Sequence, residues 1–141
     1  MHALQVITAP TLGDVCDLVP RTTPHFGLLL VAPRWPQDTD LVADAIAQLA
    51  TAGLACLAVW GEGCERIHDI ADEVFCAADA AESATDAVVM TTWHDGESLE
   101  ETIDFFRGAA IPDDAYAETC GTWVVAAVRA EDLAAQVRFL A

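Results

Sequence analysis

The chain has 141 residues, 54% of them hydrophobic, which is enough to bury the core of one domain. Its 23 acidic residues face six basic ones, all of them arginine, so the formal net charge at pH 7 is −17. Without lysine the chain has no P-loop lysine and no Schiff-base lysine, and without a basic surface it is not expected to bind nucleic acid. The acidity favours a cationic partner, but it also fits a biased genome composition, and the sequence leaves both explanations open.

The five cysteines are spread along the chain without a CxxC pair, which indicates reduced thiols and not a disulfide framework. The first residues lack the basic and apolar regions of a signal peptide. No apolar run approaches the roughly 20 residues that a membrane-spanning helix needs. We therefore predict a cytoplasmic protein without a membrane partner.

Residues 1–26 are punctuated by three prolines, and within them only residues 4–8 are compatible with a strand. We predict that this segment is an arm that packs on the rest of the chain and is not a domain by itself. Residues 27–141 are predicted to form the main domain, so that the chain is one domain overall.

From residue 26 onward, apolar runs typical of strands buried on both faces alternate with helical patterns. Strands are predicted over residues 26–32, 54–60, 74–76, 88–92 and 122–128. Helices are predicted from a cap at Asp38 or Thr39 to Gly53, and over residues 64–71, 98–108 and 130–140, with residues 77–86 as a surface connection. The alternation predicts the α/β class: a single three-layer αβα domain, Rossmann-like or flavodoxin-like, with a mainly parallel sheet of four to six strands.

Ligands of open parallel sheets bind at the carboxyl ends of the strands, and the segment after the fourth predicted strand, residues 91–101, is the richest in polar chemistry. Ser98 and Glu101 have the spacing of a capping box, and acidic residues suit the start of a helix, which accounts for Glu97 and its neighbours without a function. The alternative is that His94 and Asp95 face a crevice as catalytic acid/base groups or as ligands of a divalent metal.

The second candidate segment, residues 109–121, is long enough to return over the His94 loop as a lid. Pro112, Asp113 and Asp114 predict a turn or a short helix within it. Cys120 and His94 would form a nucleophile–base pair if the lid brought them together, and a buried unreactive cysteine is the alternative. Asp113, Asp114 and Tyr116 are candidates for a ligand or partner surface.

Each of the four tryptophans lies at or near the end of a predicted strand, where it packs in the rim of the core or contributes to a ligand or partner surface. For the second interpretation we select Trp35 with its neighbour Arg34, and Trp93 with Glu97. The sequence has no nucleophile elbow and no metalloprotease motif. No cofactor is therefore predicted, with a divalent metal at His94 and Asp95 left open.

Several short motifs occur together: TTWHD at residues 91–95, SLEE at 98–101, FF at 105–106 and PDDxYxxTC at 112–120. In this combination the chain resembles a family of small bacterial α/β proteins without a known activity, over residues 54–128. The resemblance implies that the His94 stretch and the 112–120 loop belong to one structural feature. It implies no catalytic residue and no cofactor.

Three functions follow as hypotheses. The first is an acidic, non-catalytic interaction module that binds a basic protein, as an immunity protein, an antitoxin or an accessory subunit. The second is a small-molecule or metal-dependent enzyme or ligand-binding domain with its site at His94 and Asp95. The third is a homo-oligomer such as a homodimer, held by exposed aromatic residues. The absence of a recognisable nucleophile, cofactor cradle or metal constellation favours the first and a role other than catalysis.

Overall fold

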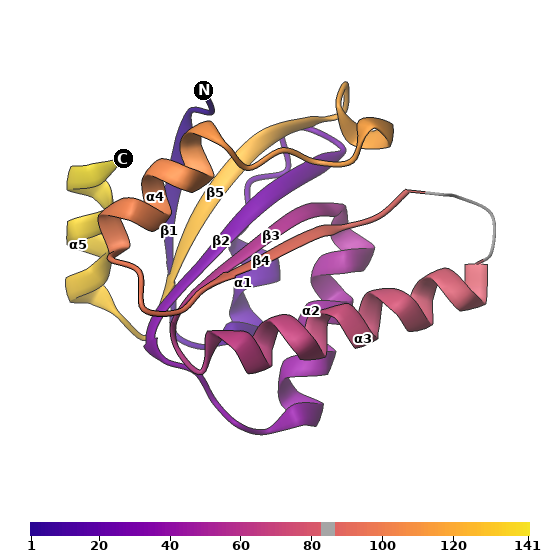
Figure 1. Cartoon of the computed structure of the whole chain (residues 1–141), viewed down its shortest axis with the longest axis horizontal. Helices are drawn as coiled ribbons and strands as arrows, with labels where there is room; N and C mark the ends of the chain where they lie inside the picture. The colour runs from indigo at the N-terminus through magenta and orange to yellow at the C-terminus, as the bar shows by residue number, and fades with distance from the viewer. Residues whose placement is uncertain (83–86) are drawn as a thin grey trace.

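The computed structural model of the chain describes residues 1–82 and 87–141, and in these residues one parallel sheet has the strand order β1-β5-β2-β3-β4 (Figure 1). The strands are β1 (Leu4–Ala9), β2 (His25–Arg34), β3 (Leu54–Glu62), β4 (Met90–His94) and β5 (Cys120–Val128). The helices are α1 (Val15–Leu18), α2 (Thr39–Ala52), α3 (Cys64–Glu82), α4 (Leu99–Gly108) and α5 (Glu131–Leu140), with 3-10 turns η1 (Leu12–Asp14) and η2 (Asp114–Tyr116). This confirms the predicted α/β fold with three layers.

Helices α1, α2 and α3 cover one face of the sheet, and α4 and α5 cover the other (Figure 1). Strands β2 and β5 lie inside the sheet, and Phe26–Ala32 and Thr122–Val128 are buried along their whole length. Their side chains point alternately into the two helical layers, which is why both strands read as continuous apolar runs.

The predicted ends of two helices are confirmed in detail. The Asp38 carboxylate accepts a hydrogen bond from the Leu41 backbone N–H at 3.2 Å, and Gly53 ends α2 with a φ of 114°. Ser98 and Glu101 form the capping box of α4. Local sequence is sufficient here because each cap involves residues within one helical turn.

The strand predicted over residues 74–76 is wrong, because these residues continue α3. Ile67, Ile70, Ala71 and Phe75 are spaced three and four residues apart and are all buried on the same side of this helix. The predicted connection begins inside the same helix, since residues 77–82 also belong to α3, and residues 83–86 lie outside the described residues.

Strand β4 differs from the expected buried strand over residues 88–92. It begins two residues later, runs through His94 and forms the edge of the sheet beside β3. Met90 and Trp93 are about half exposed, so the apolar run does not reflect burial on both faces. An apolar run by itself does not distinguish a central strand from an edge strand.

The segment 1–26, expected to be an arm, supplies the opposite edge of the sheet. Strand β1 pairs in parallel with β5, from Leu4 opposite Trp123 to Ala9 opposite Val128. Leu12, Val15 and Val19 then enter the core beneath α2. No helix within the described residues is both long enough and apolar enough to cross a membrane.

The close approach of β2 to Trp123 provides a test of the packing. A Cβ on Gly27 would lie 2.2 Å from a ring carbon of Trp123, whereas a Cβ on Gly108 would meet nothing within 4 Å. We expect Gly27→Ala to lower the free energy of unfolding by about 1–3 kcal/mol through overpacking. Gly108→Ala, the matched control in α4, should raise it by up to about 1 kcal/mol. Urea unfolding measures both, and a Gly27→Ala variant as stable as the wild type would contradict this packing.

Candidate functional site

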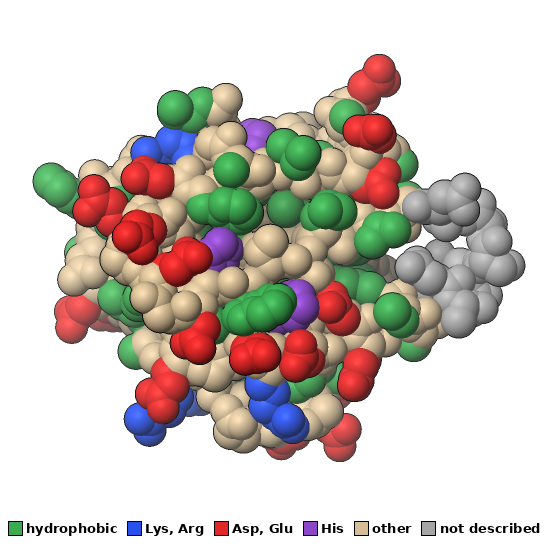
Figure 2. All heavy atoms as spheres, in the orientation of Figure 1, with side chains coloured by type: hydrophobic (Ala, Val, Ile, Leu, Met, Phe, Trp, Pro, Cys, Tyr) green, Lys and Arg blue, Asp and Glu red, His purple; other side chains and the backbone are tan. Residues whose placement is uncertain are grey.

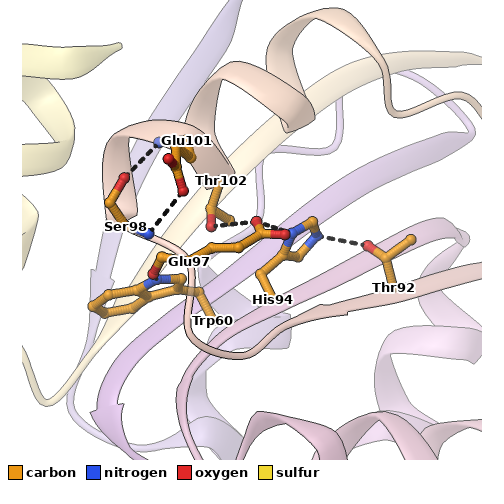
Figure 3. Close-up of polar contacts among 7 residues, drawn as sticks. All are labelled: Trp60, Thr92, His94, Glu97, Ser98, Glu101 and Thr102. Atoms are coloured by element: carbon orange, nitrogen blue, oxygen red, sulfur yellow. Dashed lines mark hydrogen bonds and ion pairs between the residues drawn. The ribbon is translucent and has the colours of Figure 1, made fainter.

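His94, the last residue of β4, is buried, and both of its ring nitrogens have partners (Figure 3). Nδ1 lies 2.7 Å from the Glu97 carboxylate and Nε2 lies 3.0 Å from the Thr92 hydroxyl. Because a carboxylate only accepts, Nδ1 donates to Glu97, and the Thr92 hydroxyl can either donate to Nε2 or accept from it. The Phe105 ring of α4 packs against the imidazole at 4.8 Å between centroids. The imidazole is therefore held within the fold and is not directed into a crevice.

Glu97 is the centre of this network (Figure 3). Its carboxylate also accepts from the buried Thr102 hydroxyl at 3.4 Å, and its backbone carbonyl accepts from the Trp60 indole N–H at 2.9 Å. The capping box of Ser98 and Glu101 follows directly. The polar residues that predicted a site are thus largely engaged with one another, and they close the connection between β4 and α4.

Asp95 lies in the exposed turn after β4, while its neighbour His94 is buried under α4. The two side chains therefore occupy different environments and form no joint site. Among the side chains that the structure describes, no group of three or more from His, Cys, Asp or Glu is arranged to hold a metal ion.

The predicted lid is wrong, because residues 109–121 stay at the amino end of the sheet (Figure 1). Cys120 is opposite His25 at the start of β2, whereas His94 is opposite Trp60 towards the end of β3. In a parallel sheet these two positions lie at opposite ends of the strands. Helix α4 carries the chain back to the amino ends of the strands, where β5 begins. Cys120 and His94 therefore cannot form a nucleophile–base pair, and the His94 stretch and the 112–120 loop are two structural features.

The candidates in the 112–120 loop mostly hold that loop in place. Asp113 accepts from the Ala115 backbone N–H at 2.9 Å and from the Val88 backbone N–H at 3.2 Å. Tyr116 packs against the His25 ring at 4.5 Å. Asp114 is exposed at the start of η2. These contacts link the loop to the starts of β2 and β4.

The environment of Cys120 also opposes nucleophilic chemistry. Burial raises the pKa of its thiol to about 11, and burial together with the charge of Cys120 raises the pKa of Cys56 to about 12. A reactive cysteine requires a lowered pKa, because the thiolate is the nucleophile. Both thiols stay protonated at neutral pH.

A second histidine network joins α3 to the edge strand β4, and its His68 and Asp72 lie outside every predicted motif. His68 Nε2 is 3.1 Å from the Thr91 hydroxyl, which donates to Asp72 at 2.7 Å. The His68 ring packs against Trp93 at 4.4 Å between centroids. The spacing of His68 and Asp72, four residues apart on a helix, is the one sequence signal for this arrangement. His68 thus packs against one side of Trp93, which stays partly exposed to solvent.

The remaining candidates lie at the carboxyl end of β2. Arg34 is exposed and forms an ion pair with Glu62 at 3.3 Å. Trp35 is buried, and its indole N–H donates to the Trp60 carbonyl at 2.9 Å. Trp35 is therefore a packing residue whose ring closes the end of the sheet.

Comparison with protein-family models matches residues 7–138 to one family, whose description is "Domain of unknown function (DUF7684)". No curated protein and no solved structure matches the chain.

The contacts of His94 predict a structural role for this residue. We expect His94→Ala to lower the free energy of unfolding by about 1–3 kcal/mol, because Glu97, Thr92 and Phe105 lose a buried partner. Asp95→Ala, an exposed neighbour, should change it by less than about 0.5 kcal/mol. Chemical denaturation of both variants gives the comparison. Equal stabilities would show that the His94 network does not hold the turn.

The cysteine environments predict thiol reactivity. Cys76 is exposed, whereas Cys16, Cys56, Cys64 and Cys120 are buried. At pH 8 we expect a disulfide reagent such as dithionitrobenzoate to modify Cys76 rapidly and the other thiols only after unfolding, because modification requires an accessible thiolate. Mass spectrometry of the modified peptides identifies the site, and Cys76→Ser removes the rapid phase. Rapid labelling of Cys120 in the folded protein would contradict its burial.

Proposed function

We propose that the chain, which belongs to the DUF7684 family of domains of unknown function, is a non-catalytic protein-interaction module. The partner is a basic protein that docks an extended segment along β4. This is the chemistry expected of an immunity protein, an antitoxin or an accessory subunit. The observation that carries the proposal is the exposed, uncharged and apolar edge of the sheet at β4.

The β4 edge lacks the features that normally prevent strand pairing. Residues 88–93 include no Pro and no charged side chain, although edge strands are usually protected by one or the other. Val88, Met90 and Trp93 are 50%, 43% and 44% exposed. Because β4 is last in the strand order, only its inner side pairs with another strand of the sheet. A partner strand can therefore form main-chain hydrogen bonds with β4 while its side chains contact Met90 or Trp93.

Acidic side chains surround this edge, and Figure 2 shows them on both sides of β4. Asp69 and Asp72 come from α3, and Asp95 and Glu97 follow the end of the strand, all with at least partly exposed side chains. Asp113 reaches the residues that precede the strand. An apolar strip bordered by carboxylates suits a segment that alternates apolar with basic residues.

A second copy of the chain is a less suitable occupant of β4. Symmetric pairing of two β4 strands would bring the same acidic flanks of two molecules together, each with a net charge of −17. Like charges across an interface oppose association, whereas a basic partner gains from long-range attraction. The proposed partner is therefore a different protein.

We place the proposed interaction in the cytoplasm, as the composition predicts, and in a bacterium, as the family resemblance implies. The five cysteines are all free thiols, as a reducing compartment requires. The interaction requires no metal and no cofactor. In this proposal the acidic side chains serve to recognise the partner. A biased genome composition alone would explain the acidity but not the uncharged edge strand.

Two exposed aromatic residues provide a matched test. Trp93 lies on the β4 edge, and Phe139 is 90% exposed on α5. We expect Trp93→Ser to weaken binding of the basic partner about tenfold or more, because interface tryptophans dominate binding energy. Phe139→Ser should leave binding unchanged. Affinity capture from host extract with both variants, followed by binding measurements on the purified partner, compares them.

Salt and self-association complete this test. Binding of the partner should weaken between low and physiological ionic strength, since exposed charges are screened over about 8 Å at 0.15 M salt. Light scattering should find a monomer. A partner retained equally by Trp93→Ser, or a dimer that Trp93→Ser dissociates, would overturn the proposal.

A further inference from the structure

The carboxyl end of β5 lies at a change in chain direction that the proposed interaction does not use. Strand β5 lies between β1 and β2. The chain leaves β1 and β2 towards α1 and α2 on one face of the sheet, and it leaves β5 towards α5 on the other face (Figure 1). Connections that diverge in this way open a crevice at the ends of adjacent parallel strands, where open α/β sheets bind small ligands.

A pocket of about 320 Å³ occupies this crevice. Small-molecule sites typically enclose about 300–1,000 Å³, so it is of sufficient size. Two of the six arginines of the chain, Arg34 and Arg129, line it together with Thr11. Its apolar wall is formed mainly by Leu12, Trp35, Pro36 and Leu41. No Asp or Glu is among the described residues that line the pocket, although acidic residues outnumber basic ones 23 to 6 in the chain.

Arg129 is held in an unusual backbone conformation at this position. Its φ of 53° lies in the left-handed region, and no other described residue except glycine has a positive φ. Its backbone N–H donates to the Ala9 carbonyl at 3.0 Å, and its Nε donates to the Pro10 carbonyl at 3.3 Å. A left-handed backbone conformation at a residue such as arginine destabilises the folded protein, and such residues tend to occur at functional sites. At Arg129, the hydrogen bond from Nε to Pro10 orients the side chain of a residue that lines the pocket.

The cations at the pocket are available to a ligand. Within the described residues, no carboxylate forms an ion pair with Arg129. Arg34 pairs with Glu62, but both side chains are largely exposed, so this pair is weak and an incoming anion can compete with it. Two arginines, each with a guanidinium able to bind an oxyanion in a bidentate manner, thus line one largely apolar cavity.

We propose that this pocket binds a small organic anion, a carboxylate or a phosphate monoester, whose charged group contacts Arg129 and Arg34 and whose apolar body lies against Leu12 and Leu41. The site is separate from the β4 edge, because β2 and β3 lie between β5 and β4. Ligand binding here and partner binding at β4 can therefore succeed or fail independently.

The test uses the full chain labelled with ¹⁵N and three probes of similar shape: 2-naphthyl phosphate, 2-naphthoate and the uncharged 2-naphthalenemethanol. We expect at least one of the two anions to shift the amide resonances of Thr11, Arg34 and Arg129 saturably, and the alcohol to bind about tenfold or more weakly. The anion that binds more tightly identifies the charged group.

Arginine variants locate the binding. Arg129→Gly removes the guanidinium and retains the fold, since glycine adopts a positive φ without strain. We expect it and Arg34→Gln each to weaken the anion's binding about tenfold. Arg66→Gln, an exposed α3 residue outside the pocket, removes one charge as a control and should change affinity less than about twofold. The proposal is overturned if neither anion shifts these resonances, if the alcohol binds as tightly, or if Arg129→Gly binds like the wild type.

Discussion

Backbone hydrogen bonds that hold β5 between β1 and β2 determine the position of every candidate site in this protein. They join the two ends of the chain, because β1 begins at Leu4 and β5 is the last strand. With β5 inside the sheet, β4 is left at one edge. The same insertion places the carboxyl end of β5, which leads to α5 on one face of the sheet, beside the ends of β1 and β2, which lead to α1 and α2 on the other face. An exposed edge strand and a crevice are thus two consequences of one strand order.

The polar residues after β4 show how a dense cluster can be structural. His94, Glu97, Thr92 and Thr102 bind one another in a chain of hydrogen bonds beneath α4. Buried polar groups need such partners, and a satisfied network rigidifies its surroundings. This network and the His68 network act from opposite faces of β4. Together they hold a short strand of five residues in place while its outer edge stays open.

Negative charge is spread over the chain, and two places that lack it are informative. Acidic side chains are scattered widely over the surface that Figure 2 shows. The outer edge of β4 has no charge of its own, and the pocket at the end of β5 is lined by cations alone among its charged residues. General acidity serves solubility and repels other copies of the chain. This general acidity does not explain an uncharged apolar edge strand or two arginines that line one pocket. These are the two features from which we infer binding.

The sequence by itself determined the α/β class, the helix caps at Asp38 and Ser98, and the buried strands β2, β3 and β5. These depend on hydrophobic period and on contacts within one turn of helix, both of which are local properties. Only the tertiary structure decided the rest. Whether Val88 to Trp93 is central or at an edge, whether residues 109–121 cover His94, and which arginines meet at a pocket all depend on strand order. Strand order is set by pairing between residues that are far apart in the sequence, such as Leu4 with Trp123, and no local pattern encodes it.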